Sequence, residues 1–334
     1  MSQDILSDVL RSVRLRGAVF YYVSGGRSWV AEAPASRDIA AAVMPESEHV
    51  MEYHVITHGA CWGAIVGEQP VRLHAGDVVL FPHGDAHVMS SAPGMRAATD
   101  TPSYFEQKAD QLPFVLRIEE DAKAPTEVDD GETRLVCGFL GCDVRPFNPL
   151  IATLPRILHL QAKDHDLTAQ LMVRAVAESK DKRPGGEAML ERMSEMMFVD
   201  AVRRYVDTLP EHSQGWLAGL RDRFVGRALA LMHDAPSQGW TVDELGRRVG
   251  LSRSALHERF AEMIGQPPMQ YLANWRMQVG AGLLRNSNAT VAAIAQEVGY
   301  ESEAAFSKAF KRLVGSPPAT WRREVTRSRR EERR

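Results

Sequence analysis

Two stretches near the C-terminal end carry polar and charged side chains at a spacing that a helix would place on one exposed face. Paired apolar residues mark the buried side, Leu256 and Phe260 in the first stretch and Phe306 and Phe310 in the second. The outward residues are Arg253, Ser254, His257 and Glu258 in the first stretch, and Glu303, Ala304, Ser307, Lys308, Lys311 and Arg312 in the second. Arginine and lysine can donate to guanine, glutamate can accept from cytosine, and alanine can contact the thymine methyl group. The alternative is that these are ordinary solvated residues of a helix surface.

The elements that would hold these faces are present twice, because the stretch from Thr241 to Gly250 recurs as Thr290 to Gly299. Each copy begins with a threonine that can cap a helix, continues with apolar residues three and four apart, and ends in a glycine suited to a left-handed turn. A second helix then begins at Ser252 or Ser302 and stops at a glycine followed by two prolines. Two short helices joined by a tight turn can place the second helix in a DNA major groove. The matching caps and stops favour paired helix-turn-helix units over unrelated helical hairpins.

Residues 219–323 resemble the DNA-binding domain of the AraC/XylS family of bacterial transcription regulators. The likeness is closest from Ala292 to Arg312 and at Gly315-Ser-Pro-Pro318. The resemblance implies two helix-turn-helix units joined by a long helix, here from Met269 to Leu284, with promoter DNA as the partner. It also implies that the outward faces named above contact the DNA.

The charge distribution supports a nucleic-acid partner for the C-terminal part. From Arg221 to the end there are 19 Lys and Arg against 12 Asp and Glu, a net charge of +7, whereas the preceding part carries −10. A basic end suits phosphate groups. Part of the excess lies in residues 324–334, a basic tail that we expect to be disordered and to contribute little.

Composition indicates an ordinary globular protein with room for two domains. The chain has 334 residues, of which 44% are hydrophobic and 25% charged. It contains no apolar stretch long enough to span a bilayer, and its start lacks a basic region followed by a hydrophobic run. Three cysteines do not make a disulfide framework. We therefore expect a cytoplasmic protein with no membrane partner.

The front half has a different pattern, of short apolar runs with β-rich composition, at residues 18–23, 52–57, 77–81 and 133–137. Many short strands predict a sandwich or a barrel. The segment from Gly76 to His87 resembles the second cupin motif, in which Gly, Pro, Gly and His recur at fixed spacing, although Ser91 stands where cupins often have Asn. The resemblance implies a cupin-like β-barrel.

In cupins, the histidine of this motif joins two histidines and a glutamate of an earlier motif to hold a divalent metal. By resemblance, His87 is the later ligand and His54 the first of the earlier ones, but Ile56 and Ala60 stand at the other two positions. Two ligands rarely hold a metal alone. The residues that could complete a site are Cys61, His58 and His83. The alternative is that His54 and His87 hydrogen-bond inside the barrel or line an organic ligand pocket, so we expect no required cofactor and take a divalent metal as the candidate.

The three cysteines, Cys61, Cys137 and Cys142, are redox candidates, because some relatives of the cupin-bearing subgroup respond to oxidants through cysteine. The favoured alternative is that they fill the core, since free cysteine is among the most buried residue types.

Residues 161–214 predict helices, broken by the polar run 180–186. A methionine-rich stripe that includes Met189, Met193 and Met197 is expected to form a homodimer interface, as the helices after the barrel do in similar regulators, or else to pack on the barrel. The polar stretch 210–215 would link these helices to the next domain.

These features predict an α+β two-domain protein. It comprises a cupin-like β-barrel over residues 1–160, helices over 161–214, and an all-α double helix-turn-helix domain over 215–323. We expect a sequence-specific DNA-binding transcription regulator that responds to a small-molecule, metal or redox effector through the cupin-like domain. The family favours an activator, which would also contact RNA polymerase, and repression is left open.

We expect no enzymatic activity. The main alternative is a metal-dependent cupin enzyme with a regulatory helical domain, and the broken first motif argues against it. A third alternative, an architectural DNA-binding protein without an effector, would leave a barrel of more than a hundred residues without a role.

Overall fold

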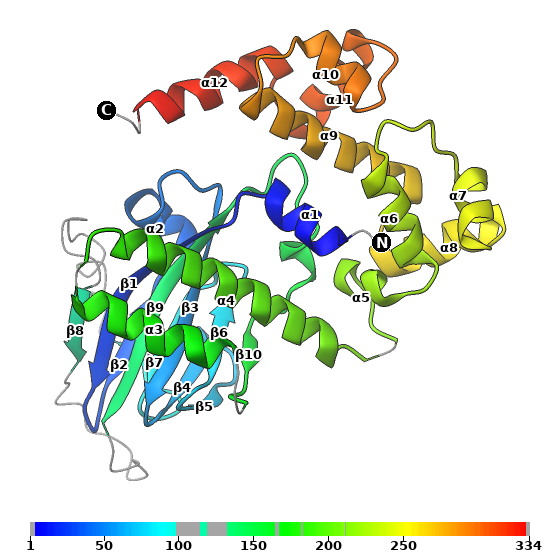
Figure 1. Cartoon of the computed structure of the whole chain (residues 1–334). Coiled ribbons are helices and arrows are strands. Elements are labelled where there is room, and N and C mark those ends of the chain that lie inside the picture. The colour runs from blue at the N-terminus through cyan, green and yellow to red at the C-terminus, as the bar shows by residue number, and fades with distance from the viewer. Residues whose placement is uncertain are drawn as a thin grey trace. The chain divides into compact units, whose positions relative to one another are not determined.

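The computed structural model describes residues 4–97, 114–118, 132–163, 167–181, 183–210 and 212–331 (Figure 1). Its contacts divide the chain into two units. The first, called here the sheet unit, comprises Leu15–Asp143 and Leu154–Thr208, and the second, the helical unit, comprises Met1–Arg14, Val144–Thr153 and Leu209–Arg334. The chain therefore passes between the units four times. The domain boundaries that the sequence suggested differ from this division, since two segments of the first 160 residues belong with the C-terminal helices.

The sheet unit is built on two β-sheets. A six-stranded sheet has the order β10-β6-β3-β9-β1-β8, in which only the pair β1 and β8 is parallel, and a four-stranded sheet has the order β2-β7-β4-β5. The strands are β1 (Arg16–Gly25), β2 (Val30–Ala33), β3 (His49–His58), β4 (Ala60–Ile65), β5 (Val71–His74), β6 (Val78–Phe81), β7 (His87–Ser90), β8 (Phe114–Ile118), β9 (Thr133–Cys142) and β10 (Leu158–Leu160). The expectation of a sheet-rich domain followed by helices is confirmed. All four strand segments that the sequence indicated lie in or overlap β1, β3, β6 and β9.

Side-chain alternation along β3 gives its two faces different neighbours, because successive residues of a strand point to opposite sides. Tyr53 shares a hydrogen bond of 2.8 Å with Ser194 of α4 (Gly186–Thr208). On the same side α3 (Leu167–Asp181) packs beside α4, and both helices cross the six-stranded sheet in Figure 1. Glu52 and His54, on the other face, point into the space between the two sheets.

Apolar side chains of both sheets fill most of that space. The core includes Trp29, Ile56, Leu73, Phe81 and Phe139, all of which are fully buried. The helix α2 (Ser36–Val43) adds Ile39 and Val43 to the same cluster. Burial on this scale holds the strands that carry the polar residues described below.

The helical unit contains two helix-turn-helix pairs. Its helices are α1 (Ile5–Ser12), α5 (Trp216–Arg221), α6 (Val225–Asp234), α7 (Val242–Val249), α8 (Arg253–Ile264), α9 (Pro268–Asn286), α10 (Val291–Glu297), α11 (Glu303–Val314) and α12 (Pro318–Glu331), with a short 3-10 helix, η3, at Ile151–Thr153. The helix α9 confirms the long connection expected between the two pairs. None of the helices in the described ranges is both long and apolar enough to cross a membrane.

Residues 324–331, which the sequence pattern assigned to a separate tail, continue α12 in the structure. Trp321 is buried and Val325 packs against the same core, so a narrow apolar stripe on α12 anchors the helix. The charged run is thus continuous with the helix that begins at Pro318. Residues 332–334 lie outside the described residues.

Candidate functional site

The caps of the helix-turn-helix pairs are formed by the residues that the sequence indicated. The hydroxyl groups of Thr241 and Ser252 accept from the first turns of α7 and α8, at 3.1 and 3.2 Å. Thr290 and Ser302 do the same for α10 and α11. Gly250, at φ 86°, adopts the left-handed conformation between α7 and α8 that suits glycine. Both pairs are therefore built by the same local rules.

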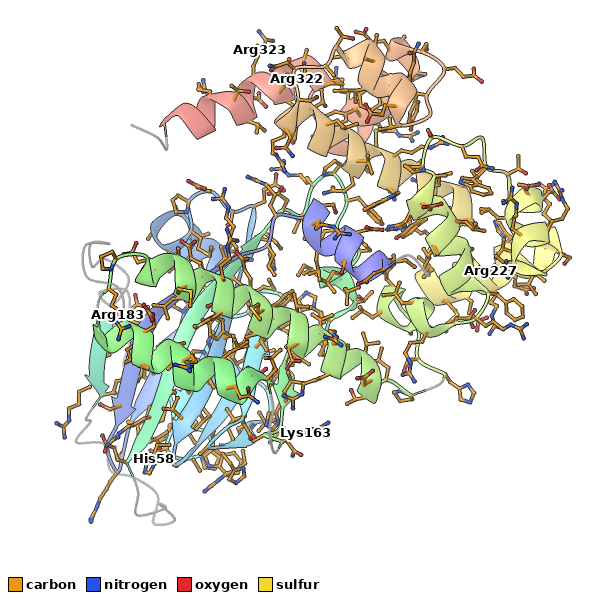
Figure 2. All side chains as sticks on the ribbon, in the orientation of Figure 1. His58, Lys163, Arg183, Arg227, Arg322 and Arg323 are labelled. Carbon is orange, nitrogen blue, oxygen red and sulfur yellow. The ribbon has the colours of Figure 1, made fainter. Side chains whose placement is uncertain are left out.

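The outward faces of α8 and α11 have the composition expected from the sequence. Leu256, Phe260, Phe306 and Phe310 are fully buried. Nine of the ten predicted contact residues are exposed, and Ser307 is half-buried; the exposed ones are Arg253, Ser254, His257, Glu258, Glu303, Ala304, Lys308, Lys311 and Arg312. The structure thus gathers each set on one face, and contact with bases stays a prediction. Arg227 on α6 and Arg323 on α12 are further exposed cations of this unit that the sequence argument did not single out (Figure 2).

The sheet unit holds a polar cluster between its two sheets. Glu52 and His54 lie two residues apart on β3 and so share a face, while His87 opens β7 in the other sheet. All three side chains are buried, and one ligand atom from each lies within 4.8 Å of the others. They line a cavity of about 60 Å³ whose remaining wall is mainly apolar, with Met89 and Leu116 among its residues.

The two imidazoles are in direct contact. His54 Nε2 lies 2.8 Å from His87 Nε2, and His87 Nδ1 lies 2.9 Å from the carbonyl oxygen of Asp85. Because a carbonyl only accepts, His87 Nδ1 carries the proton and donates it, which leaves a lone pair on Nε2. The ring of His87 also stacks on Phe81 with 3.7 Å between ring centres. His87 is therefore fixed with its free nitrogen toward the cavity.

Burial controls the charge of the cluster. It lowers the pKa of His87 to about 4 and holds the pKa of His54 well below its usual value, while it raises the pKa of Glu52 to about 8. The Glu52 oxygens lie 3.8 Å from His54 Nε2 and 3.7 Å from His87 Nε2. At pH 7 these contacts are not ion pairs, because both imidazoles are neutral and most of Glu52 is protonated. Glu52 Oε2 is buried without a hydrogen-bond partner in the described part of the chain.

Cys137 belongs to the same cluster. It lies opposite His54 in the register of β3 and β9, and its Sγ is 2.8 Å from His54 Nδ1. Burial raises the pKa of Cys137 well above its ordinary value and that of Cys61 to about 12. Cys142 is also buried. Their burial suits the core alternative better than fast reaction with oxidants, which requires thiolate.

The sequence motif identifies His54 and His87 but not Glu52. The motif places its glutamate after the histidines, where Ala60 stands, whereas Glu52 lies two residues before His54. The remaining histidine candidates lie elsewhere. His58 is exposed at the end of β3 (Figure 2), and His83 contacts the carbonyl of Leu154 at 2.9 Å. Two ligand-type residues at positions i and i+2 of one strand were the signal available.

Comparison with known proteins places both units in described families. The family profile described as Cupin matches residues 4–207, and the one described as Helix-turn-helix domain matches residues 245–324. A putative AraC-like transcription regulator of Streptomyces lividans is 31% identical over 97% of this chain and 99% of its own length. The regulator AlkR of Acinetobacter baylyi is 25% identical over 96% of this chain and 99% of its own, and the RCS-specific activator RclR of Escherichia coli is 25% identical over 83% and 85%. The chain therefore belongs to the AraC family of DNA-binding transcription regulators and carries an N-terminal cupin domain.

Proposed function

We propose that this regulator controls transcription in response to a divalent metal ion held by Glu52, His54 and His87. The observation that carries the proposal is the unpartnered Oε2 atom of Glu52, buried beside two imidazole nitrogens in a mainly apolar cavity. A buried polar group without a partner costs free energy, so its presence calls for an explanation such as an ion. A bound cation would supply the missing partner.

The donor set fits such an ion. Two imidazoles and one carboxylate suit zinc or ferrous iron, with further positions left for water. His87 donates the N–H of its Nδ1 to a backbone carbonyl, and His54 has Cys137 at its Nδ1; partners of this kind orient metal-binding histidines. The two Nε2 atoms contact each other, so an ion between them replaces that hydrogen bond. The bound ion would supply positive charge that keeps Glu52 ionised.

The size of the cavity supports a sensor over the alternative of a metal-dependent enzyme. A volume of about 60 Å³ can hold an ion with a few waters. Sites for organic molecules are larger, roughly 300 Å³ and above. We therefore propose that the cupin domain has no enzymatic activity. The sensor role also gives this domain a purpose that an architectural DNA-binding protein would lack.

A covalent path leads from the pocket to the helical unit. The strand β9 carries Cys137 and ends at Cys142, and the segment 144–153 that follows belongs to the helical unit. There the backbone N–H of Phe147 donates to Gln278 Oε1 of α9 at 3.0 Å, and Gln278 Nε2 donates to the Ser12 carbonyl at 2.8 Å. A shift of β9 on ion binding would reach the helix between the two helix-turn-helix pairs. An ion that binds one arrangement better than another changes DNA affinity by that difference.

The finer partner assignments belong to the same proposal. We propose a homodimer formed through α4, because Met189 and Met196 are each 49% exposed and lie seven residues apart on that helix. We also propose activation through RNA polymerase at promoters in the cytoplasm, as the family membership favours.

Metal analysis of the purified full-length protein tests the metal assignment. We expect about one equivalent of zinc or iron in the wild type, and loss of that metal in Glu52→Ala and His87→Ala. His58→Ala is the matched control, since His58 lies on the same strand but is exposed, and it should retain the metal. A wild-type protein that takes up neither ion after incubation with zinc or iron salts, followed by desalting, would contradict the assignment.

The regulatory step needs a second measurement. DNA affinity of the wild type should differ between zinc-loaded and chelator-treated protein, and Glu52→Ala should lose this difference while still binding DNA. Equal affinity in both states, with metal bound, would leave a metal site without a regulatory role.

A further inference from the structure

One arginine on α9 contacts the neighbouring parts of both helix-turn-helix pairs. Arg276 is half-buried near the middle of this helix. Its Nε donates to the Pro236 carbonyl at 2.7 Å, and its Nη2 donates to the Gln238 carbonyl at 2.8 Å. Both carbonyls belong to the loop between α6 and α7, which leads into the first pair. Such bonds from a charged donor are stronger than neutral ones.

The same guanidinium faces the turn of the second pair. Arg276 Cζ lies 6.0 Å from the ring centre of Tyr300, at the limit for a cation–π contact. Tyr300 directly follows the turn glycine Gly299, whose φ is 83°. A Cβ at Gly299 would come within 2.8 Å of the Cα and carbonyl oxygen of Ser237 and 2.9 Å of Arg276 Nη2. The loop, the arginine and the second turn are therefore packed without room for a methyl group.

We propose that Arg276 fixes the two recognition helices, α8 and α11, relative to each other and so determines the spacing between the two DNA boxes that this protein accepts. Each pair has its own buried residues, Leu256 and Phe260 in the first and Phe306 and Phe310 in the second, so neither needs Arg276 for its core. What Arg276 supplies is a link between them beside α9. It is a positioning residue that need not touch DNA.

The dimensions make this link matter for recognition. The 19 residues of α9 span about 28 Å, close to the roughly 34 Å between successive major grooves on one side of DNA. One inserted base pair rotates the second box by about 34° around the DNA axis. A rigid pair of recognition helices cannot follow that rotation, whereas a loosened pair can.

Arg322 provides a matched control. It is also half-buried, and its guanidinium also donates to two backbone carbonyls, those of Leu284 at 3.1 Å and Ala289 at 2.7 Å. Leu284 lies in the last turn of α9 and Ala289 lies between α9 and α10, so this arginine ties α12 to the end of α9 next to the second pair. Figure 2 labels Arg322 on α12. Its removal should weaken the second pair without freeing one pair from the other.

The test measures how DNA affinity depends on spacing. The probe is a duplex selected from a random library by the full-length wild-type protein, together with versions that carry one or two base pairs inserted between its two footprinted boxes. We expect one insertion to weaken wild-type binding about a hundredfold, the loss of most base contacts of one helix. Arg276→Ala should bind the original duplex about tenfold more weakly and lose less than about fivefold on insertion. Arg322→Ala should keep the wild-type ratio.

Arg276→Lys serves as a second variant, because lysine keeps the positive charge but lacks the planar fork that places one N–H on each carbonyl. Thermal unfolding of every variant reports whether it is folded. An insertion ratio of Arg276→Lys that is clearly below the wild-type ratio supports the proposal, and this result decides the test if Arg276→Ala fails to fold. Arg276 variants with the wild-type ratio would overturn it, as would an Arg322→Ala ratio lowered equally or a selected duplex with a single box. None of these outcomes depends on metal binding.

Discussion

At the scale of single residues, the proton on Glu52 determines what the pocket can hold. With its pKa near 8, the carboxyl is mostly neutral at pH 7, and a cation must displace that proton in order to bind. His54 and His87 are already neutral, so neither has to release a proton, and the proton that His54 Nε2 donates to His87 has only to move to His54 Nδ1. Loss of the Glu52 proton is therefore the step that opposes cation binding. Because this proton is lost more readily as the pH rises, the affinity of the pocket for metal should rise with pH.

The unusual pKa of Glu52 also predicts a pH dependence of folding in metal-free protein. A carboxyl whose pKa is raised in the folded state contributes stability at low pH that is lost as pH rises through about 8. The buried histidines have lowered pKa values, so most of their effect on stability lies below pH 6.5, and it is shared by the two proteins compared below. Between pH 6.5 and 8, Glu52 should therefore reduce the free energy of unfolding by about 2 kcal/mol.

Urea unfolding of chelator-treated wild type and Glu52→Gln at pH 6.5 and pH 8 measures this effect. The difference between the two proteins should change by about that amount over the interval, because the amide cannot ionise. A constant difference would show that the carboxyl titrates in its ordinary range.

At the scale of elements, the helix-turn-helix pairs could be predicted almost residue by residue, because their signals are local. Thr241 and Ser252 form helix caps, and Gly250 forms a left-handed turn, and in each case the residues that interact are only a few positions apart in the sequence. Glu52 could not be assigned in this way, since its relation to His87 depends on two sheets meeting. The packing of α1 and residues 144–153 with the C-terminal helices also rests on distant contacts, such as that from Gln278 to Ser12.

The recognition helix α11 yields a prediction at this scale. Lys308 lies in its first half, where base edges are read, and Lys311 lies one turn later, toward the phosphates. Lys308→Ala should change which base is preferred at one position, with about 1–3 kcal/mol of discrimination lost there. Lys311→Ala should weaken binding to all sequences alike. It should also reduce the slope of log affinity against log salt concentration by about one.

Affinity measured on a panel of single-base variants of the selected duplex, at several salt concentrations, separates these effects. The two substitutions each remove one exposed positive charge, so each controls for the other. Identical changes across the whole panel would contradict the assignment of the two positions to bases and phosphates.

At the scale of the whole molecule, regulation requires that ion binding in the pocket and DNA binding by the helical unit be energetically coupled. The chain passes between the two units four times, and one of these passages continues β9 directly beyond the pocket. The Gln278 side chain accepts a hydrogen bond from the backbone of Phe147, in the segment that follows β9. It also donates a hydrogen bond to the carbonyl of Ser12, at the end of α1. A single buried side chain on α9 thus joins two segments that are covalently continuous with the sheet unit, one that leads into it and one that leaves it.

Replacing Gln278 by leucine should uncouple DNA binding from metal while leaving the metal site intact. The side chain is 3% exposed, so leucine leaves the Phe147 N–H and the Ser12 carbonyl without partners at a cost of about 1–3 kcal/mol each. We expect the zinc-dependent change in DNA affinity to shrink several-fold and the affinity for zinc, followed by titration, to stay within about twofold. Asn274→Leu is the control, because within the described residues the Asn274 amide bonds to Gln266 and Gln270, which lie in or just before the same helix. An undiminished zinc response in Gln278→Leu would mean that another passage between the units carries the signal.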